Sequence, residues 1–106
     1  MISSQTTAVP QDPSAVTLPV KLRDEYTGIY KAGTALTVVI ARHGDELIGA
    51  VNGGKPYAIK MELKDVLFTP GQPQLRRPVQ RDADGRVVGI VRRRDGYDAS
   101  LLKRAS

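Results

Sequence analysis

Residues 57–63 are Tyr57-Ala58-Ile59-Lys60-Met61-Glu62-Leu63, in which every second side chain is large and apolar. This period of two is that of a β-strand, whose successive side chains point to opposite faces. The four large apolar side chains would share one face, and Lys60 and Glu62 would share the other. The stretch therefore predicts a strand that is buried on one side only.

Similar short strands recur around this segment at intervals of about ten residues. We expect them at Gly28–Lys31, Ala35–Arg42, Glu46–Val51, Val66–Thr69, Leu75–Arg81, Arg86–Arg93 and Tyr97–Lys103. The connections carry residues that tolerate positive φ, namely His43-Gly44-Asp45, Asn52-Gly53-Gly54, Asp84-Gly85 and Asp95-Gly96. Strands joined by tight turns run antiparallel. The sequence therefore predicts an all-β antiparallel meander of about eight strands that forms an open or closed barrel.

Two residues interrupt the regular strands. Pro78 cannot donate to a β-ladder, so its strand is expected to lie at an edge or to be bulged. Gly89 interrupts the next strand, and a bulge there would bring Ile90 onto the same face as Val87. Both features favour an open or incompletely closed barrel.

The N-terminal residues 1–19 differ in composition from the rest of the chain. They are rich in Ser, Thr, Gln and Pro, and their prolines oppose a helix. We expect residues 1–19 to form a flexible tail or linker and residues 20–106 to form the β domain. Lys21–Tyr26 is predicted to make one helical turn that ends at Gly28.

The composition excludes several classes of protein. A chain of 106 residues forms one domain, and the absence of cysteine excludes disulfides, thiolate metal sites and cysteine nucleophiles. No stretch approaches the roughly 18 apolar residues of a membrane helix, and the N-terminus lacks the basic and apolar regions of a signal peptide. An export signal removed earlier is still compatible with this sequence.

The net charge of +5 is unevenly distributed. Residues 1–71 hold seven Lys and Arg and seven acids, whereas the chain beyond Gly71 holds nine bases and four acids. If the last three strands are neighbours, their arginines form a patch for phosphate, carboxylate or nucleic acid: Arg77, Arg81, Arg86, Arg92 and Arg94. Nucleic acid is the least favoured, because Tyr97 is the only aromatic residue there that can stack on a base. A well-solvated surface is the alternative.

Three segments are similar to known motifs, and each has a simpler interpretation. Gly49–Pro56 resembles a phosphate-binding loop, but Pro56 replaces the Ser or Thr that contacts magnesium and a strand follows, so a hairpin turn is favoured. Asp82–Gly85 resembles the start of a calcium loop, which would place Arg93 where a glutamate belongs. Ser100–Lys103 matches the Ser-x-x-Lys of serine hydrolases, but on a strand the two side chains would face opposite sides.

His43 is the only histidine and is expected to be an exposed turn residue, since no second imidazole or nucleophile accompanies it. No catalytic constellation is complete. The sequence therefore predicts a protein that is not an enzyme by itself and that uses no cofactor and no metal.

The stretch from Leu22 to Lys103 resembles a small β domain found behind the catalytic domain of bacterial serine hydrolases related to penicillin-binding proteins and class C β-lactamases. The matching segments are Tyr26-Thr27-Gly28-Ile29-Tyr30, Leu36-Thr37-Val38, Asp45-Glu46-Leu47 and Arg81-Asp82-Ala83-Asp84-Gly85-Arg86-Val87-Val88-Gly89-Ile90, with Gly96 before the final strand. The chain departs from the family at Arg92, which replaces a usually apolar strand residue, and at Pro78, which enters a normally regular strand.

This resemblance implies a lipocalin-like barrel without catalytic residues, a periplasmic or secreted location, and a hydrolase domain as partner. The favoured function is accordingly a non-enzymatic accessory or protein-interaction domain, with self-association through unpaired strand edges. A second hypothesis is small apolar-ligand binding in the barrel interior, lined by Tyr30, Val38, Ile40, Ile59, Met61, Phe68 and Val87, although any core needs such residues. A third is anion or nucleic-acid binding by the arginines.

Overall fold

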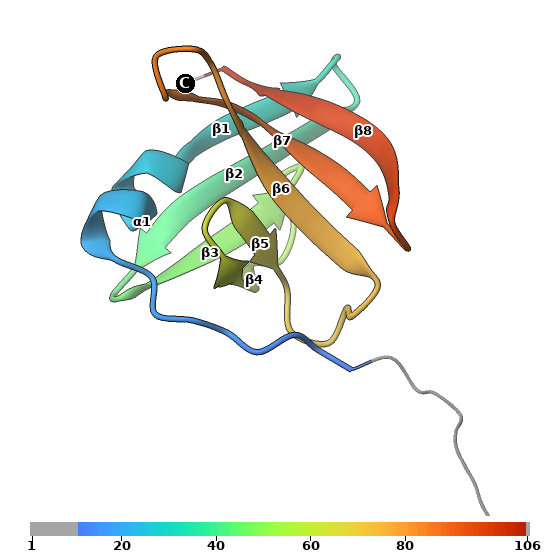
Figure 1. Ribbon diagram of the computed structural model, residues 1–106. Coiled ribbons are helices and arrows are strands. Elements are labelled where there is room, and N and C mark those ends of the chain that lie inside the picture. The colour runs from blue at the N-terminus through green and yellow to red at the C-terminus, as the bar shows by residue number, and fades with distance from the viewer. Residues whose placement is uncertain (1–10, 106) are drawn as a thin grey trace, which may run out of the picture.

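The computed structural model describes residues 11–105, which form a closed barrel of eight antiparallel strands with one short helix at one end (Figure 1). The elements are α1 (Val20–Tyr26), β1 (Gly28–Ala32), β2 (Leu36–His43), β3 (Glu46–Val51), β4 (Tyr57–Leu63), β5 (Val66–Phe68), β6 (Leu75–Arg81), β7 (Val87–Arg94) and β8 (Tyr97–Arg104). The predicted all-β meander is confirmed, and every predicted strand boundary lies within one residue of the observed one.

The turns follow the predicted backbone chemistry. Gly44 and Gly85 have positive φ in the β2–β3 and β6–β7 connections. Asp95 and Gly96 both have positive φ, at 51° and 82°, which is the requirement of the tight turn that matches the twist of a hairpin. These residues turn each strand back onto its predecessor, so sequence neighbours become neighbours in the sheet.

The strand of Pro78 was predicted to lie at an edge or to be bulged, and it is bulged, between Gln80 and Arg81. The edge position and the open or incompletely closed barrel were wrong. β6 pairs with β5 on one side, where Val66 lies opposite Pro78, and with β7 on the other. The barrel closes because β1 pairs with β8, with Tyr30 opposite Arg104. A single missing donor at Pro78 removes one ladder bond without excluding a neighbour on either side.

Bulges allow the strands to bend around the barrel. The pairing of β6 with β7 shifts register between Gln80 and Arg81, next to Gly89. As predicted, Val87 and Ile90 then both belong to the buried core. A bulge increases local bending and twist, which is what a small closed barrel requires.

The core fills the half of the barrel next to α1. Tyr26 of α1 and Tyr30 of β1 are fully buried there, beside Leu47 and Ile59. The Tyr30 hydroxyl donates to the backbone oxygen of Tyr26 at 2.7 Å, so the helix is fixed over this end of the barrel.

The segment before α1 runs along the outside of the barrel past β4 (Figure 1). β3 pairs with β4 only between Tyr57 and Ile59, which leaves the following part of β4 without that neighbour. The Val16 amide donates to the Met61 oxygen on this edge at 2.8 Å. Residues 11–19 therefore cover part of an open strand edge, while the first ten residues of the predicted tail lie outside the described residues.

Within residues 11–105, no helix has both the length and the apolar character needed to cross a membrane.

Candidate functional site

A cavity of about 450 Å³ occupies the end of the barrel opposite α1. Its wall is formed by residues near the start of β2, β4 and β6, residues at the end of β3 and in the second half of β7, one residue of β8, and two residues of the connections before β4 and β6. The residues around it are Leu36, Val38, Val51, Lys55, Tyr57, Gln72, Leu75, Arg77, Ile90, Val91, Arg92 and Leu102. Most are apolar, and the charged members are all basic.

Arg77 points into the barrel because of its position on β6. Leu75, Arg77 and Val79 are buried and alternate with less buried neighbours, so an arginine occupies the inward face between two apolar residues. The Arg77 side chain donates to the Thr69 hydroxyl at 3.0 Å. Burial lowers the pKa of Arg77, because it penalises the charged form, and the nearby Arg92 lowers it further.

Tyr57 forms the platform beneath Arg77. The guanidinium carbon lies 5.0 Å from the centre of the Tyr57 ring, which is the geometry of a cation–π contact. The ring also lies close to Gly49, where an added Cβ would come within 2.9 Å of ring atoms and 2.7 Å of Ile59. The Tyr57 hydroxyl oxygen is buried and has no hydrogen-bond partner within the described part of the chain.

Two further basic residues, Lys55 and Arg92, line the same cavity and are exposed. The register of β6 and β7 sets Arg92 across from Arg77, since Arg76 lies opposite Arg93 and Val79 opposite Ile90. None of the ion pairs among residues 11–105 includes Lys55, Arg77 or Arg92. The cavity therefore combines apolar walls with positive charge.

The residues predicted to line a ligand site are all buried, but most of them pack against one another. One core cluster contains Tyr30, Val38, Ile40, Ile59, Met61 and Val87. Phe68 is buried as well, outside that cluster. Only Val38 also lines the cavity, because the others lie nearer to α1 or turn away.

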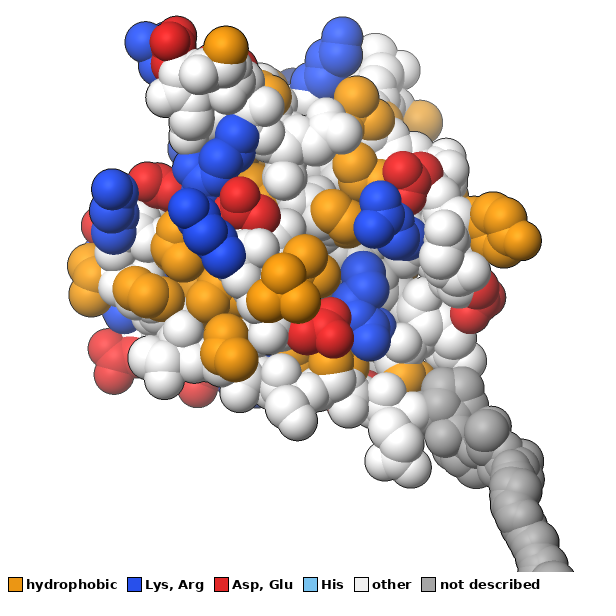
Figure 2. Space-filling view, viewed as in Figure 1, with side chains coloured by type: hydrophobic (Ala, Val, Ile, Leu, Met, Phe, Trp, Pro, Cys, Tyr) orange, Lys and Arg blue, Asp and Glu red, His pale blue; other side chains and the backbone are white. Residues whose placement is uncertain are grey.

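The five predicted anion-binding arginines are divided between the two ends of the barrel. Arg77 and Arg92 line the cavity, whereas Arg81 and Arg86 border a separate depression beside α1. Arg94 is exposed at the end of β7. Figure 2 shows Lys and Arg side chains spread among acidic and hydrophobic ones on the viewed face, without one continuous basic surface.

Arg81 binds acids of its own chain. Its guanidinium donates to both carboxylate oxygens of Asp65, at 2.8 and 3.0 Å, and to Glu25 at 2.7 Å. These bonds hold the pKa of Asp65 below its usual value. Because its charge is compensated, Arg81 is a structural arginine that connects α1 to the β4–β5 turn.

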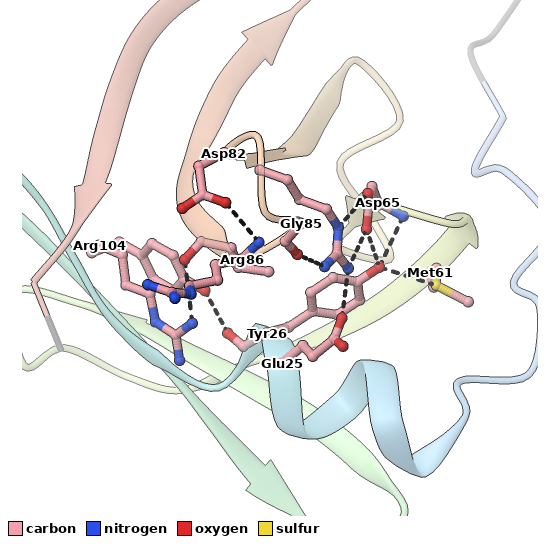
Figure 3. A network of polar contacts seen from close by, with 11 residues as sticks. Glu25, Tyr26, Met61, Asp65, Asp82, Gly85, Arg86 and Arg104 are labelled. Atoms are coloured by element: carbon pink, nitrogen blue, oxygen red, sulfur yellow. Dashed lines mark hydrogen bonds and ion pairs between the residues drawn. The ribbon is translucent and has the colours of Figure 1, made fainter.

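Tyr26 completes this network, and Figure 3 shows its hydroxyl in contact with Asp65 and Met61. The hydroxyl donates to the Asp65 carboxylate and accepts from the Asp65 amide, both at 2.8 Å. Burial, followed by the bond to Asp65, raises the pKa of Tyr26 to about 12. Arg104 of β8 donates to the Thr27 oxygen at 2.6 Å, which ties the last strand to the same end.

The motif-like segments have structural positions in the barrel. Ser100 and Lys103 both lie on β8, three positions apart on a strand, so they face opposite sides. His43 is exposed at the last position of β2, next to the turn. The Asp82 carboxylate accepts from the amides of Asp84 and Arg86, which stabilises the β6–β7 turn. Among the described residues, no three His, Asp or Glu side chains are grouped as a metal ion requires.

The sequence of β6 contains a signal for the position of Arg77 in the cavity. Leu75, Arg77 and Val79 alternate with a period of two, so Arg77 belongs to the apolar face of its strand. Tyr57 was placed on the apolar face of its strand. The proximity of Arg77, Tyr57 and Arg92 could not be predicted from the sequence, because the three residues lie on different strands.

Comparisons with known proteins give no relative from which a function can be transferred: no protein-family model matches the chain, and no curated protein matches it significantly.

Proposed function

We propose that this barrel binds a small organic molecule in the cavity opposite α1. The observation that carries the proposal is the cavity itself, whose volume of about 450 Å³ lies in the range of small-molecule sites. Eight-stranded barrels have interiors that are either filled by side chains or hold one small ligand. Here the half next to α1 is filled, and the other half is open.

Two features favour a binding site over imperfect packing. Leu75, Ile90 and Leu102 are almost completely buried and supply a rigid apolar wall. The basic side chains of Lys55, Arg77 and Arg92 line the same space. A mostly apolar cavity with a few convergent polar groups is the usual architecture of a ligand site.

The test is binding of N-phenyl-naphthylamine, an uncharged fluorescent probe, to the wild-type protein and to two tryptophan variants. Val51 lines the cavity and Val39 does not, while their side chains are similarly exposed, at 36% and 38%. We expect Val51→Trp to weaken probe binding by about tenfold or more and Val39→Trp to leave it near wild type. Equal effects of the two substitutions would place the probe elsewhere on the protein and contradict the proposal.

The accessory role beside a serine hydrolase stays a prediction and is compatible with a ligand site. Self-association through strand edges also stays a prediction: each of the eight described strands has a neighbour on both sides, so the edge that remains is the part of β4 beyond Ile59, which residues 11–19 partly cover. Light scattering of the purified chain at low and high salt tests self-association. A particle larger than one chain that persists at high salt would support it, and a monomer would exclude it.

A further inference from the structure

We propose that the ligand of this cavity is a carboxylic acid with an apolar body, whose carboxylate binds Arg77 and Arg92 at the cavity wall. The inference rests on the proposed binding function and adds the chemical class of the ligand. It is carried by a buried arginine that points into an apolar cavity and has no acid partner within residues 11–105.

The first argument is the uncompensated charge of Arg77. This side chain is only 7% exposed, and no carboxylate among residues 11–105 pairs with it. An arginine keeps its proton in proteins, so burial cannot neutralise it. A buried charge without a partner is costly. Thr69 and the Tyr57 ring reduce this cost, and an anion in the cavity would reduce it much further.

Arg81 is an arginine of the same fold whose positive charge is paired with acids. Arg81 lies on the same strand, four residues later, and binds Asp65 and Glu25. The chain thus supplies two acids to one inward-leaning arginine of β6 and none to the other within the described residues. The cavity side of Arg77 is where the missing acid can bind.

The second argument is the sign of the remaining polar groups. The cavity is bordered by Lys55 and Arg92 in addition to Arg77, and none of the described residues that line it is Asp or Glu. Arg92 lies across from Arg77 in the pairing of β6 with β7, so two guanidinium groups border the same space. Guanidinium groups are suited to a planar carboxylate, because a guanidinium binds its two oxygens in parallel.

The third argument is the apolar remainder of the wall. Leu36, Val38, Leu75, Ile90 and Leu102 surround the rest of the space. A fully polar anion would leave this surface without a partner, whereas an aliphatic or aromatic body would cover it and gain from leaving water. The ligand should therefore be amphipathic, with one acidic group.

Decanoate and decanol form a matched pair for the experiment, because they share a chain and differ in the head group. Each compound is tested as a competitor of bound N-phenyl-naphthylamine in the wild-type protein, in Arg77→Met and in Arg94→Met. Arg94→Met is the control, because Arg94 is exposed and lies outside the cavity. We expect decanoate to bind about tenfold or more tightly than decanol to the wild type and to Arg94→Met. The preference should fall to about twofold or less in Arg77→Met, with decanol affinity unchanged.

The outcomes separate the two proposals. If decanol competes as well as decanoate, the cavity binds ligands but the carboxylate is not recognised, and this inference is wrong while the proposed function stands. If neither compound nor the probe binds, both proposals are wrong. If Arg77→Met does not fold by circular dichroism, Arg92→Met replaces it and must also reduce the preference for decanoate, and an unchanged preference would overturn the inference.

Discussion

Tyr57 holds its position over the sheet because Gly49, its partner on β3, has no side chain. The glycine leaves room for the ring beneath the Arg77 guanidinium, whose carbon lies 5.0 Å from the ring centre. The position of this cavity-lining ring therefore depends on a residue without a side chain, since any larger residue at position 49 would compete with the ring for the same space.

Gly49→Ala is therefore expected to destabilise the fold by about 1–3 kcal/mol, because its Cβ would overlap the Tyr57 ring. Urea unfolding measures the change. The control is the same substitution in a Tyr57→Ala background, where the penalty should shrink if the ring is its cause. An equal penalty in both backgrounds would assign the strain to Ile59, the other neighbour.

Asp65 should make stability depend on acid. Its hydrogen bonds from Arg81 keep the pKa of Asp65 lower in the folded protein than its usual value. A carboxylate of this kind stabilises the fold above its unfolded pKa of about 4, and the contribution is lost as the pH falls through the folded pKa. Between about pH 5 and about pH 2, the free energy of unfolding should therefore fall more steeply in the wild type than in Asp65→Asn.

The comparison is made by urea unfolding at each pH, with Asp84→Asn, a substitution of an exposed turn acid, as the control. Asp84→Asn should keep the wild-type pH dependence. Parallel curves for Asp65→Asn and the wild type would show that the Arg81–Asp65 pair does not contribute.

At the scale of the elements, β7 carries the irregularity that shapes the barrel. Gly89 lies opposite Lys103, and a Cβ there would come within 2.7 Å of the Leu102 backbone oxygen on β8. A strand carbonyl in a ladder cannot move aside as a flexible side chain can. Gly89 therefore allows β7 and β8 to approach each other closely.

Gly89→Ala is expected to cost at least about 2 kcal/mol, because the clash is with backbone. The adjacent Val88 is exposed at 40%, and Val88→Ala should change stability by about 0.5 kcal/mol or less. Thermal and urea unfolding measure both variants. A Gly89→Ala protein as stable as Val88→Ala would show that the two strands can separate locally without cost.

At the scale of the whole molecule, closure joins the first strand to the last. The pairs Tyr30–Arg104 and Lys31–Lys103 connect β1 and β8, and the Ala105 amide donates to the Ile29 oxygen at 2.7 Å. These contacts span most of the described chain. The barrel is therefore one cooperative unit whose cavity exists only when both ends of the sheet have met.

Truncation after Leu102 should abolish the sharp unfolding transition, since it removes the partner of β1 and leaves an open edge. Lys103→Ala, which keeps the backbone of β8, should unfold as the wild type does, because the Lys103 side chain is exposed. Circular dichroism during urea unfolding distinguishes the two. A truncated chain with a wild-type transition would show that closure contributes little to stability.

The sequence by itself determined the strands and their order. Alternation within 57–63 and turn residues such as Asp95-Gly96 act through neighbouring residues, so their consequences are visible in the chain. Closure of the barrel was not predictable. Pro78 indicates the loss of one hydrogen bond of the β-ladder, but it does not determine whether β1 and β8 pair.

The candidate site was decided by tertiary structure. The position of Arg77 on an inward face followed from the sequence, but the presence or absence of an acid beside it did not. Arg81 binds Asp65 and Glu25, which are distant in the chain. Arg77 instead lies over the Tyr57 ring and shares the cavity with Arg92. Such encounters depend on the register of several strands at once, and the energy of a buried charge depends on every group that the fold brings near it.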